Sequence, residues 1–478
     1  MIYFYLSKHY INFINNQIKN ILYKDLLKLS DEVNNIFKNV NNDIIRLIFK
    51  NTKIKNRNNK LTFVDVLNYI FNYSFINSTK QQIVSDFNFR NNTNYDRSSF
   101  YKKELNIPLI FYQNLFLKIK DLLNKFMDRN LNLFNVIAVD GTYCNTNLHN
   151  QHKLETCLNM GYFDCTNQIP IELEIKGTDY NNKEIESLIN YLNKNNFNID
   201  NLILVLDRAY YSYDLINFLD NKKLNYVIRI KNNSIGIKDK NKANDKLINK
   251  NTRIINYNTT ININKKDKDN NIINLEQTLI CNLITNLNET KFNDKMVKDI
   301  YLQRWDIEVF FKLIKSNFKF ALLREHNKNT LTQYKKKYLI ILINLYLIRL
   351  IEFVYSKNNK AIKNKNKSNK KNNKHKYNNK HNNSLLIHGF KNLIEPILKS
   401  KLNNKLLLNY INSYLIKTNT IKNISNPRIS YIPFSKWYIK SYSDYYKYCK
   451  IIEAIKNNNF DNLNKNLKIL ANELKIIS

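Results

Sequence analysis

Short apolar runs bounded by polar residues dominate the middle of the chain. Residues 135–139 form one such run and end at Asp140, and residues 202–206 form another and end at Asp207. Runs of this length, rich in branched aliphatic residues, predict strands that are buried on both faces of a sheet. A single aspartate after a strand is often a turn residue or a helix cap, but here two strands end in the same way.

The elements around these two runs predict a mixed sheet. They are, in chain order, extended segments at 158–165 and 169–176 joined by a three-residue turn, a helix at 183–192, a helix from about Ser212 and a strand at 225–230. Three antiparallel strands followed by alternating helices and strands give a sheet with helices on its faces. In such a sheet, Asp140 and Asp207 lie at or near neighbouring strand ends.

A later segment, residues 300–318, has helical spacing and is apolar around most of its circumference. Four polar residues interrupt it at spacings of three, four and seven: Tyr301, Arg304, Glu308 and Lys315. At about 100° per residue they fall within an arc of roughly 60°. A helix that is apolar on nearly every side is expected to be buried.

A buried carboxylate at Glu308 requires a positive partner. Arg304 and Lys312 stand four residues away on either side, so an ion pair within the helix is one interpretation. The other is a divalent cation shared with Asp140 and Asp207, because hard cations prefer sites made of oxygen ligands.

Three motifs carry a resemblance to a known family. They are Asp140-Gly141-Thr142, Asp207-Arg208-Ala209-Tyr210 and the pattern Tyr-(2)-Arg-(3)-Glu-(6)-Lys, which matches at all four positions. The chain resembles the DDE transposases of bacterial insertion sequences, in the group defined by that pattern, best over residues 130–345.

The resemblance implies an RNase H-like catalytic core with Asp140, Asp207 and Glu308 as catalytic residues. It further implies that these three hold Mg²⁺, or Mn²⁺, as two ions. The residues assigned to DNA contact are Tyr301, Arg304, Lys315, Arg208 and Trp305. The implied reaction is metal-dependent cleavage at transposon ends and strand transfer of 3′ hydroxyls into target DNA.

The expected fold class is an α/β, RNase H-like mixed sheet with flanking helices, a β-rich insertion, and helical regions at both ends. The expected parts are a helical end-recognition region at 1–130, a catalytic domain at 131–355 with its insertion at 232–295, a Lys/Asn-rich linker at 356–384 and a helical region at 385–478. The expected partners are double-stranded DNA, as terminal inverted repeats and target, and a second copy of the chain in a synaptic homodimer. Two alternatives stay open: a DNA-binding derivative without activity, and a structure-specific nuclease on the same fold.

Composition adds little to this interpretation. The net charge of +37 permits DNA binding, but five Gly and five Pro in 478 residues, with abundant Lys and Asn, are typical of an AT-rich coding sequence. Five scattered cysteines predict a reducing compartment, which fits an intracellular, DNA-associated protein. The apolar run at 338–355 contains Asn344, Arg349 and Glu352, so it predicts a core helix and no membrane span.

Overall fold

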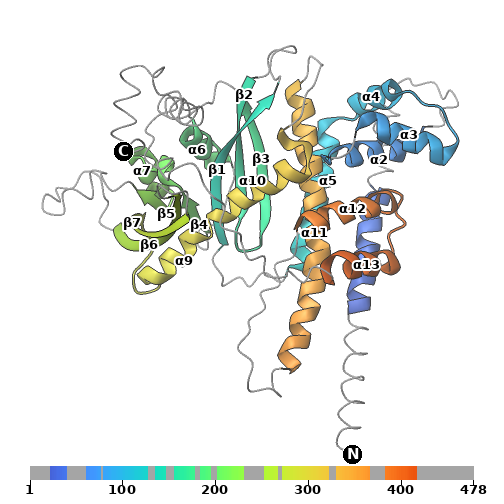
Figure 1. The fold of residues 1–478 in the computed structure, drawn as a ribbon. Coiled ribbons are helices and arrows are strands. Elements are labelled where there is room, and N and C mark those ends of the chain that lie inside the picture. Colours follow the sequence, from blue (N-terminus) through green and yellow to red (C-terminus); the bar gives the residue numbers. More distant parts are fainter. Residues whose placement is uncertain are drawn as a thin grey trace, which may run out of the picture. The chain divides into compact units, whose positions relative to one another are not determined.

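The computed structural model places the predicted α/β core at the centre of the chain (Figure 1). It describes residues 22–39, 61–76, 79–127, 135–146, 155–177, 183–194, 202–230, 252–266, 272–321, 330–366 and 383–416. The chain divides into two compact units, of which the first comprises Met1–Tyr257 and Cys281–Ile421 and the second Asn258–Ile280 and Lys422–Ser478. Every site discussed below lies within the first unit. In the second, the described residues belong to two strands, β6 and β7.

Seven strands form one sheet in the order β3-β2-β1-β4-β5-β7-β6. In chain order they are β1 (Asn135–Thr146), β2 (Glu155–Asp164), β3 (Ile169–Gly177), β4 (Leu202–Leu206), β5 (Asn225–Ile230), β6 (Arg253–Lys266) and β7 (Ile272–Thr285). Strands β1, β2 and β3 are antiparallel neighbours, whereas β4 runs parallel to β1 and β5 parallel to β4. This order and these directions confirm the predicted RNase H-like mixed sheet.

The residues of the central strands alternate between two cores. Ile203 and Val205 of β4 face one core, and Leu204 and Leu206 face the other. The second core is closed by α6 (Glu184–Lys194) and α7 (Tyr213–Asn221), whose apolar residues complete it. Both faces of β4 are therefore covered, which is why its sequence is apolar at every position.

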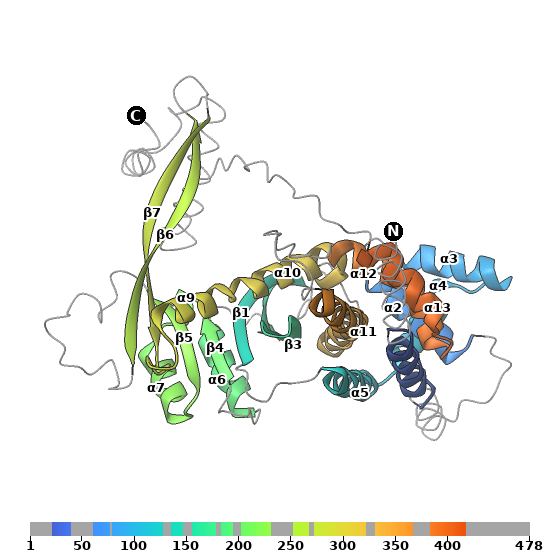
Figure 2. The same cartoon turned by 90° about the horizontal axis from the view of Figure 1, so that it is seen from below.

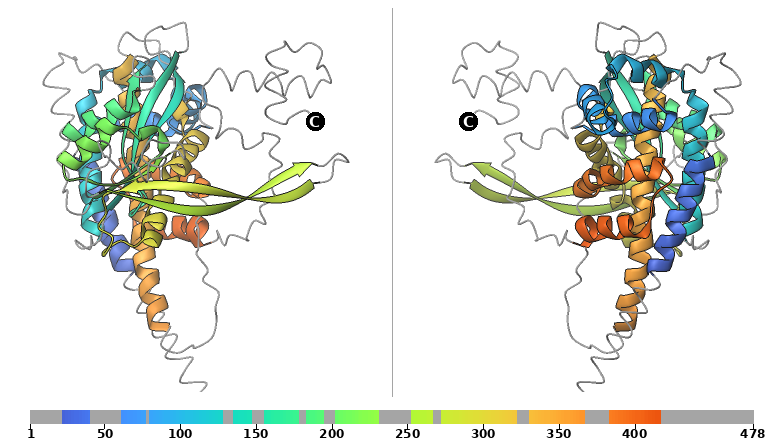
Figure 3. Two further views of the ribbon diagram at one scale, coloured as in Figure 1. Left: turned by 90° about the vertical axis from the view of Figure 1, so that its left-hand side faces the viewer. Right: turned by 90° about the vertical axis from the view of Figure 1, so that its right-hand side faces the viewer.

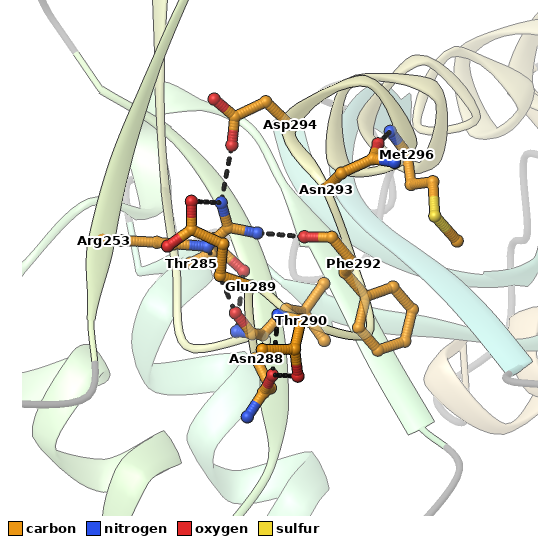
Figure 4. Close-up of polar contacts among 10 residues, drawn as sticks. Arg253, Thr285, Asn288, Glu289, Thr290, Phe292, Asn293, Asp294 and Met296 are labelled. Carbon is orange, nitrogen blue, oxygen red and sulfur yellow. Dashed lines mark hydrogen bonds and ion pairs between the residues drawn. The ribbon is translucent and has the colours of Figure 1, made fainter.

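The described residues of the insertion after β5 include two long strands. Strand β7 pairs antiparallel with β5, and β6 lies beside β7 at the edge of the sheet. Arg253, at the start of β6, donates to Asp294 Oδ1 at 2.6 Å, to the carbonyl of Leu287 at 3.3 Å and to the carbonyl of Phe292. Figure 4 shows this guanidinium inside the turn that leads from β7 to the next helix. Arg253 thereby fixes the point at which the chain returns to the catalytic face.

The segment predicted as one helix at 300–318 is two helices, so that prediction was wrong. Helix α9 (Asp294–Leu302) ends one turn before α10 (Trp305–Asn317), and the amides of Gln303 and Arg304 bond carbonyls three residues back instead of four. The two helices pack against different strands: α9 lies against β4 and β5, and α10 lies against β1 and β2. The tight turn supplies the change of direction between these surfaces.

The prediction that this segment is buried on nearly every side was also wrong. One side of α10 packs on the sheet through Ile307, Phe310, Phe311 and Ile314. The side chains of Leu302, Trp305 and Val309, by contrast, are on the surface, with 54 %, 48 % and 45 % of their area exposed.

Helices from both ends of the chain share one core with α10. They are a helix at 22–39, α2 (Phe63–Tyr73), α3 (Lys80–Asn91), α4 (Arg97–Asn106), α5 (Leu109–Phe126), α11 (Thr330–Asn366), α12 (Asn383–Leu398), α13 (Asn404–Tyr410) and a π-helical turn (Ile411–Ile416). Asn34 exchanges hydrogen bonds with the backbone of Leu402, and Asn404 donates to the carbonyl of Tyr23. Figure 3 shows the blue and orange-red helices in the same part of the molecule. Residues 1–21 and 417–478, which belong to the two predicted end regions, lie outside the described residues.

Helix α11 runs between α5, β3 and α12 (Figure 2). Within the described helices, residues Leu331–Lys357 alone have the length and hydropathy of a membrane span, and 67 % of the 18-residue window that passes this test is buried inside the protein. This burial is what a core helix requires. The helix continues to Asn366, so the linker predicted to start at 356 begins with helical residues, and its positions 367–382 lie outside those described.

Candidate active site

Asp140 and Asp207 lie level on adjacent parallel strands. The register pairs Ala138 of β1 with Val205 of β4, and each aspartate stands two residues further on. The Asp207 carboxylate accepts a hydrogen bond from the amide of Ala209 at 2.7 Å and caps a short 3₁₀ helix, Arg208–Tyr210. Asp207 directly follows the end of β4, as predicted, but the strand predicted to end at Asp140 continues to Thr146, so Asp140 lies within β1.

Glu308 reaches the same place from α10. Arg304 Nη2 donates to Glu308 Oε1 at 2.5 Å, and Arg304 Nη1 lies 3.8 Å from Asp140 Oδ2. Arg304 is buried, with only 9 % of its side chain exposed, whereas the two carboxylates keep 21 % and 28 % of theirs. The ion pair within the segment is thus present, and the same guanidinium also connects Glu308 to Asp140.

A fourth carboxylate, Glu184, was missed from the sequence. It stands in the first turn of α6, where an acidic residue is also a common partner for the helix dipole. In the structure its side chain lies over Gly141, so that a Cβ at Gly141 would come within 2.4 Å of Glu184 Oε1. The glycine beside Asp140 is therefore the feature that lets this carboxylate approach, a contact that sequence spacing does not reveal.

The four carboxylates, Asp140, Glu184, Asp207 and Glu308, form one acidic cluster. Burial raises the pKa of Asp140 to about 7, and the charges of Asp207, Glu184 and Glu308 add to the rise while Arg304 opposes it. Burial, followed by the charge of Asp207, likewise raises the pKa of Glu184. Mutual repulsion of this kind is relieved when a cation binds.

The donor set of the acidic cluster fits a hard divalent cation, since every member offers carboxylate oxygens. The four side chains are not arranged as a complete metal-coordination site. Over the parts of the chain that the structure describes, no three acidic, histidine or cysteine side chains are placed to hold one ion. Arg304 instead supplies the positive charge between Asp140 and Glu308. Metal ligation by Asp140, Asp207 and Glu308 stays a prediction.

Two further residues of the predicted pattern lie beside the acidic cluster. Lys315 Nζ donates to Thr142 Oγ1 at 2.6 Å, which ties the end of α10 to β1 two residues beyond Asp140. Tyr301 is buried, and burial raises its pKa while the charge of Arg304 lowers it. Both side chains are close to the site.

Arg208 and Trp305 occupy different surroundings. Arg208 directly follows Asp207 in the 3₁₀ helix and is half-buried. Trp305 is on the surface, at the start of α10, with the Lys312 ammonium 5.4 Å from its ring centroid. DNA contact by these two residues also stays a prediction.

Residues 132–345 match the family model described as "Transposase DDE domain". Among curated proteins, none matches the chain. Among solved structures, a cryo-EM structure of a piggyBac transposase synaptic complex with hairpin DNA is similar at 13 % sequence identity, covering 87 % of this chain and 91 % of that chain with a TM-score of 0.36.

The matched residues contain the strands β1 to β5 and the helix α10, and with them the whole acidic cluster. This part of the chain is therefore similar to a transposase DDE domain. Its sheet has the RNase H-like order of strands. Of the three carboxylates singled out from the sequence, Asp140 lies in β1, Asp207 directly follows β4 and Glu308 stands on α10.

Proposed function

We propose that the protein is a metal-dependent DNA transposase of the group with the Tyr-(2)-Arg-(3)-Glu-(6)-Lys pattern. It cuts DNA at the ends of its own element and joins the 3′ ends to target DNA. The observation that supports this most is the approach of Asp207 and Glu308 to Asp140 within the residues that match a transposase DDE domain.

In this proposal Asp140, Asp207 and Glu308 hold Mg²⁺ or Mn²⁺ as two ions. A divalent cation there supplies positive charge that activates water and offsets charge on a leaving 3′ oxygen. Glu184 adds to the negative potential that attracts the cations, since it interacts with Asp207. Asp140, whose pKa lies near 7, is kept ionised by them at neutral pH.

Arg304 has two roles in this proposal. Without DNA it pairs with Glu308 and holds Asp140 within 4 Å. With DNA, its planar guanidinium is suited to a phosphate group beside the cut strand. Lys315 contacts the next phosphate as a point charge, because its ammonium already lies at β1 beside the site. The DNA around the two phosphates held by Arg304 and Lys315 is contacted by Tyr301, Arg208 and Trp305.

The partners in this proposal are double-stranded DNA, as inverted repeats and as target, and a second copy of the chain in the synaptic complex. The protein therefore works in association with DNA inside the cell. The helices α3 and α4 carry the residues expected to recognise the DNA end, and they are joined by a short turn in which Asn92 has a positive φ of 50°.

A DNA-binding protein without catalytic activity is the second candidate. The observation that favours it is the bridge from Arg304 to Glu308 and Asp140, in which one guanidinium pairs with two of the three carboxylates.

Nicking of a plasmid that carries the gene with its flanking DNA separates the two candidates. Glu308→Gln should abolish nicking with Mg²⁺ or Mn²⁺ while leaving DNA binding nearly unchanged, because a neutral amide is a poor ligand for a hard cation. The matched control is Asp306→Asn, on the same turn of α10, whose carboxylate accepts from Gln168 at 2.6 Å. Equal nicking by wild type and Glu308→Gln, or binding without nicking by wild type, would reject catalysis at this site.

A further inference from the structure

Four lysines from four different elements gather around two aromatic rings. They are Lys80 of α3, Lys319 of the 3₁₀ turn after α10 (Lys319–Ala321), Lys337 of α11 and Lys391 of α12, here called the lysine cluster. The ammonium groups of Lys319, Lys80 and Lys337 lie 3.5, 4.9 and 5.6 Å from the ring centroid of Tyr73. The ammonium of Lys391 lies 5.0 Å from the ring centroid of Phe75.

A short backbone bridge brings these elements together. Phe75, just after α2, pairs with Phe318, just after α10, and their rings are 5.0 Å apart. The amide of Lys319 donates to the carbonyl of Ser74 at 2.8 Å, and the amide of Ile76 donates to that of Asn317 at 3.0 Å. The lysine cluster is therefore attached directly to the end of the helix that carries Glu308.

The lysine cluster concentrates positive charge where solvent is partly excluded. Burial lowers the pKa of Lys319 to about 7, and the charges of Lys337, Lys80 and Lys391 lower it further in that order. Burial also lowers the pKa of Lys337 to about 8, against which Glu104 acts. An aromatic face attracts ammonium groups without cancelling their charge, and an anion among the four lysines would restore the protonation that burial and their mutual repulsion oppose.

The position of the lysine cluster indicates which kind of anion it could bind. Lys315 reaches β1 beside the acidic cluster, and Lys319 follows four residues later along the same chain segment. On the other side, Lys391 also lines a groove of about 940 Å³ between α2, α3 and α12. A polyanion that followed α10 from the acidic cluster would reach Lys319 just past the end of that helix, and Lys391 of the same cluster lines the groove.

We propose that the lysine cluster binds backbone phosphates of the DNA that enters the active site. The proposal rests on the proposed function for its polyanion, and adds a second anchoring point between the catalytic helix and the helices α2 to α4. Phosphate oxygens accept from several ammonium groups at once, so one or two phosphates offset the repulsion among the four lysines.

The test is the salt dependence of DNA binding. At about pH 6, below the pKa of both lysines, Lys319→Met with Lys337→Met removes two charges but keeps unbranched side chains against Tyr73. The slope of log K against log salt should fall by about 0.9 for each phosphate that the variant no longer neutralises, thus by about 1.8 here. Lys335→Met is the matched control, since Lys335 is exposed on α11 and two residues from Lys337, and it should leave the slope unchanged.

A slope equal to that of wild type in a folded double variant overturns the proposal. If that variant does not fold, Lys80→Gln with Lys391→Gln tests the same site, because both lysines are half-buried at its edge. Inorganic phosphate at constant ionic strength is the second probe. A phosphate-induced rise in melting temperature that the double variant loses, without a change in slope, assigns the site to free phosphate and also overturns the proposal.

Nicking is measured separately in the same samples. If the wild type nicks DNA and the double variant keeps the salt slope of the wild type, only the proposal for the lysine cluster is rejected. A wild type that fails to nick while the slope falls in the double variant rejects the catalytic proposal and supports the lysine cluster.

Discussion

Gly161 of β2 lies directly opposite Asp140 of β1 in their antiparallel pairing. A Cβ at Gly161 would come within 2.6 Å of Phe311 Cζ, so the absence of a side chain lets α10 pack against the sheet at this level. The same helix carries Glu308, one turn earlier. The distance between Asp140 and Glu308 therefore depends on a glycine that takes no part in chemistry.

Gly161→Ala tests this dependence. Because the added methyl overpacks the interface, we expect a loss of about 1–3 kcal/mol in the free energy of unfolding, measured by denaturant titration. Nicking should fall as well, since α10 is pushed away from β1. Phe311→Leu in the same chain makes room for the methyl and should restore part of both; a double variant no better than Gly161→Ala would contradict the argument.

Glu184→Gln tests the residue that the sequence motifs did not indicate. If its charge helps to gather cations at Asp140 and Asp207, nicking at limiting Mg²⁺ should fall by about 10–100-fold, the range for supporting residues at metal sites. Glu186→Gln is the control, since Glu186 is exposed on the same helix turn. If nicking by the two variants depends on Mg²⁺ in the same way, Glu184 does not help to bind cations at Asp140 and Asp207.

Arg304→Met tests the guanidinium bridge. Removing it leaves Glu308 and Asp140 without their shared cation, and we expect a loss of about 1–3 kcal/mol, because the pair is only partly shielded from solvent. If cations bind at these carboxylates, Mg²⁺ should raise the melting temperature of the variant more than that of wild type. A purely structural arginine predicts no such difference.

The stability of the lysine cluster should depend on pH. The groups that face Lys319 are Lys80 on α3, Lys337 on α11, Lys391 on α12, Tyr73 on α2 and, across the cluster, Glu104 on α4. Between pH 7, the pKa of Lys319 in the folded chain, and 10.5, its ordinary value, the unfolded chain binds a proton that the folded chain lacks. The free energy of unfolding therefore rises with pH across this window.

Lys319→Met should flatten that rise by up to about 1.4 kcal/mol per pH unit, less the effect of solvent screening. The comparison is with Lys335→Met, in urea titrations from pH 7 to 9. Parallel curves for the two variants would show that Lys319 is protonated normally.

The strands were predictable because each central one is a continuous apolar run with covered faces. Residues 202–206 and their aspartate, for example, needed nothing beyond the pattern. The helix at 300–318 was predicted as continuous because periodicity does not register a change of packing partner; α9 and α10 lie against different strands. Glu184 and the lysine cluster could not be predicted, since both depend on contacts between elements far apart in the chain.

The direct test of the account is the number of Mn²⁺ ions that the protein binds, counted from the paramagnetic resonance of the free ion during titration. Asp140→Asn with Glu308→Gln is compared with a control, Asp306→Asn with Glu186→Gln, that also removes two negative charges, one from α10 and one from α6. The account predicts that wild type and control bind Mn²⁺ and that the first variant has lost this binding. Equal binding by all three proteins would contradict a metal site at these carboxylates.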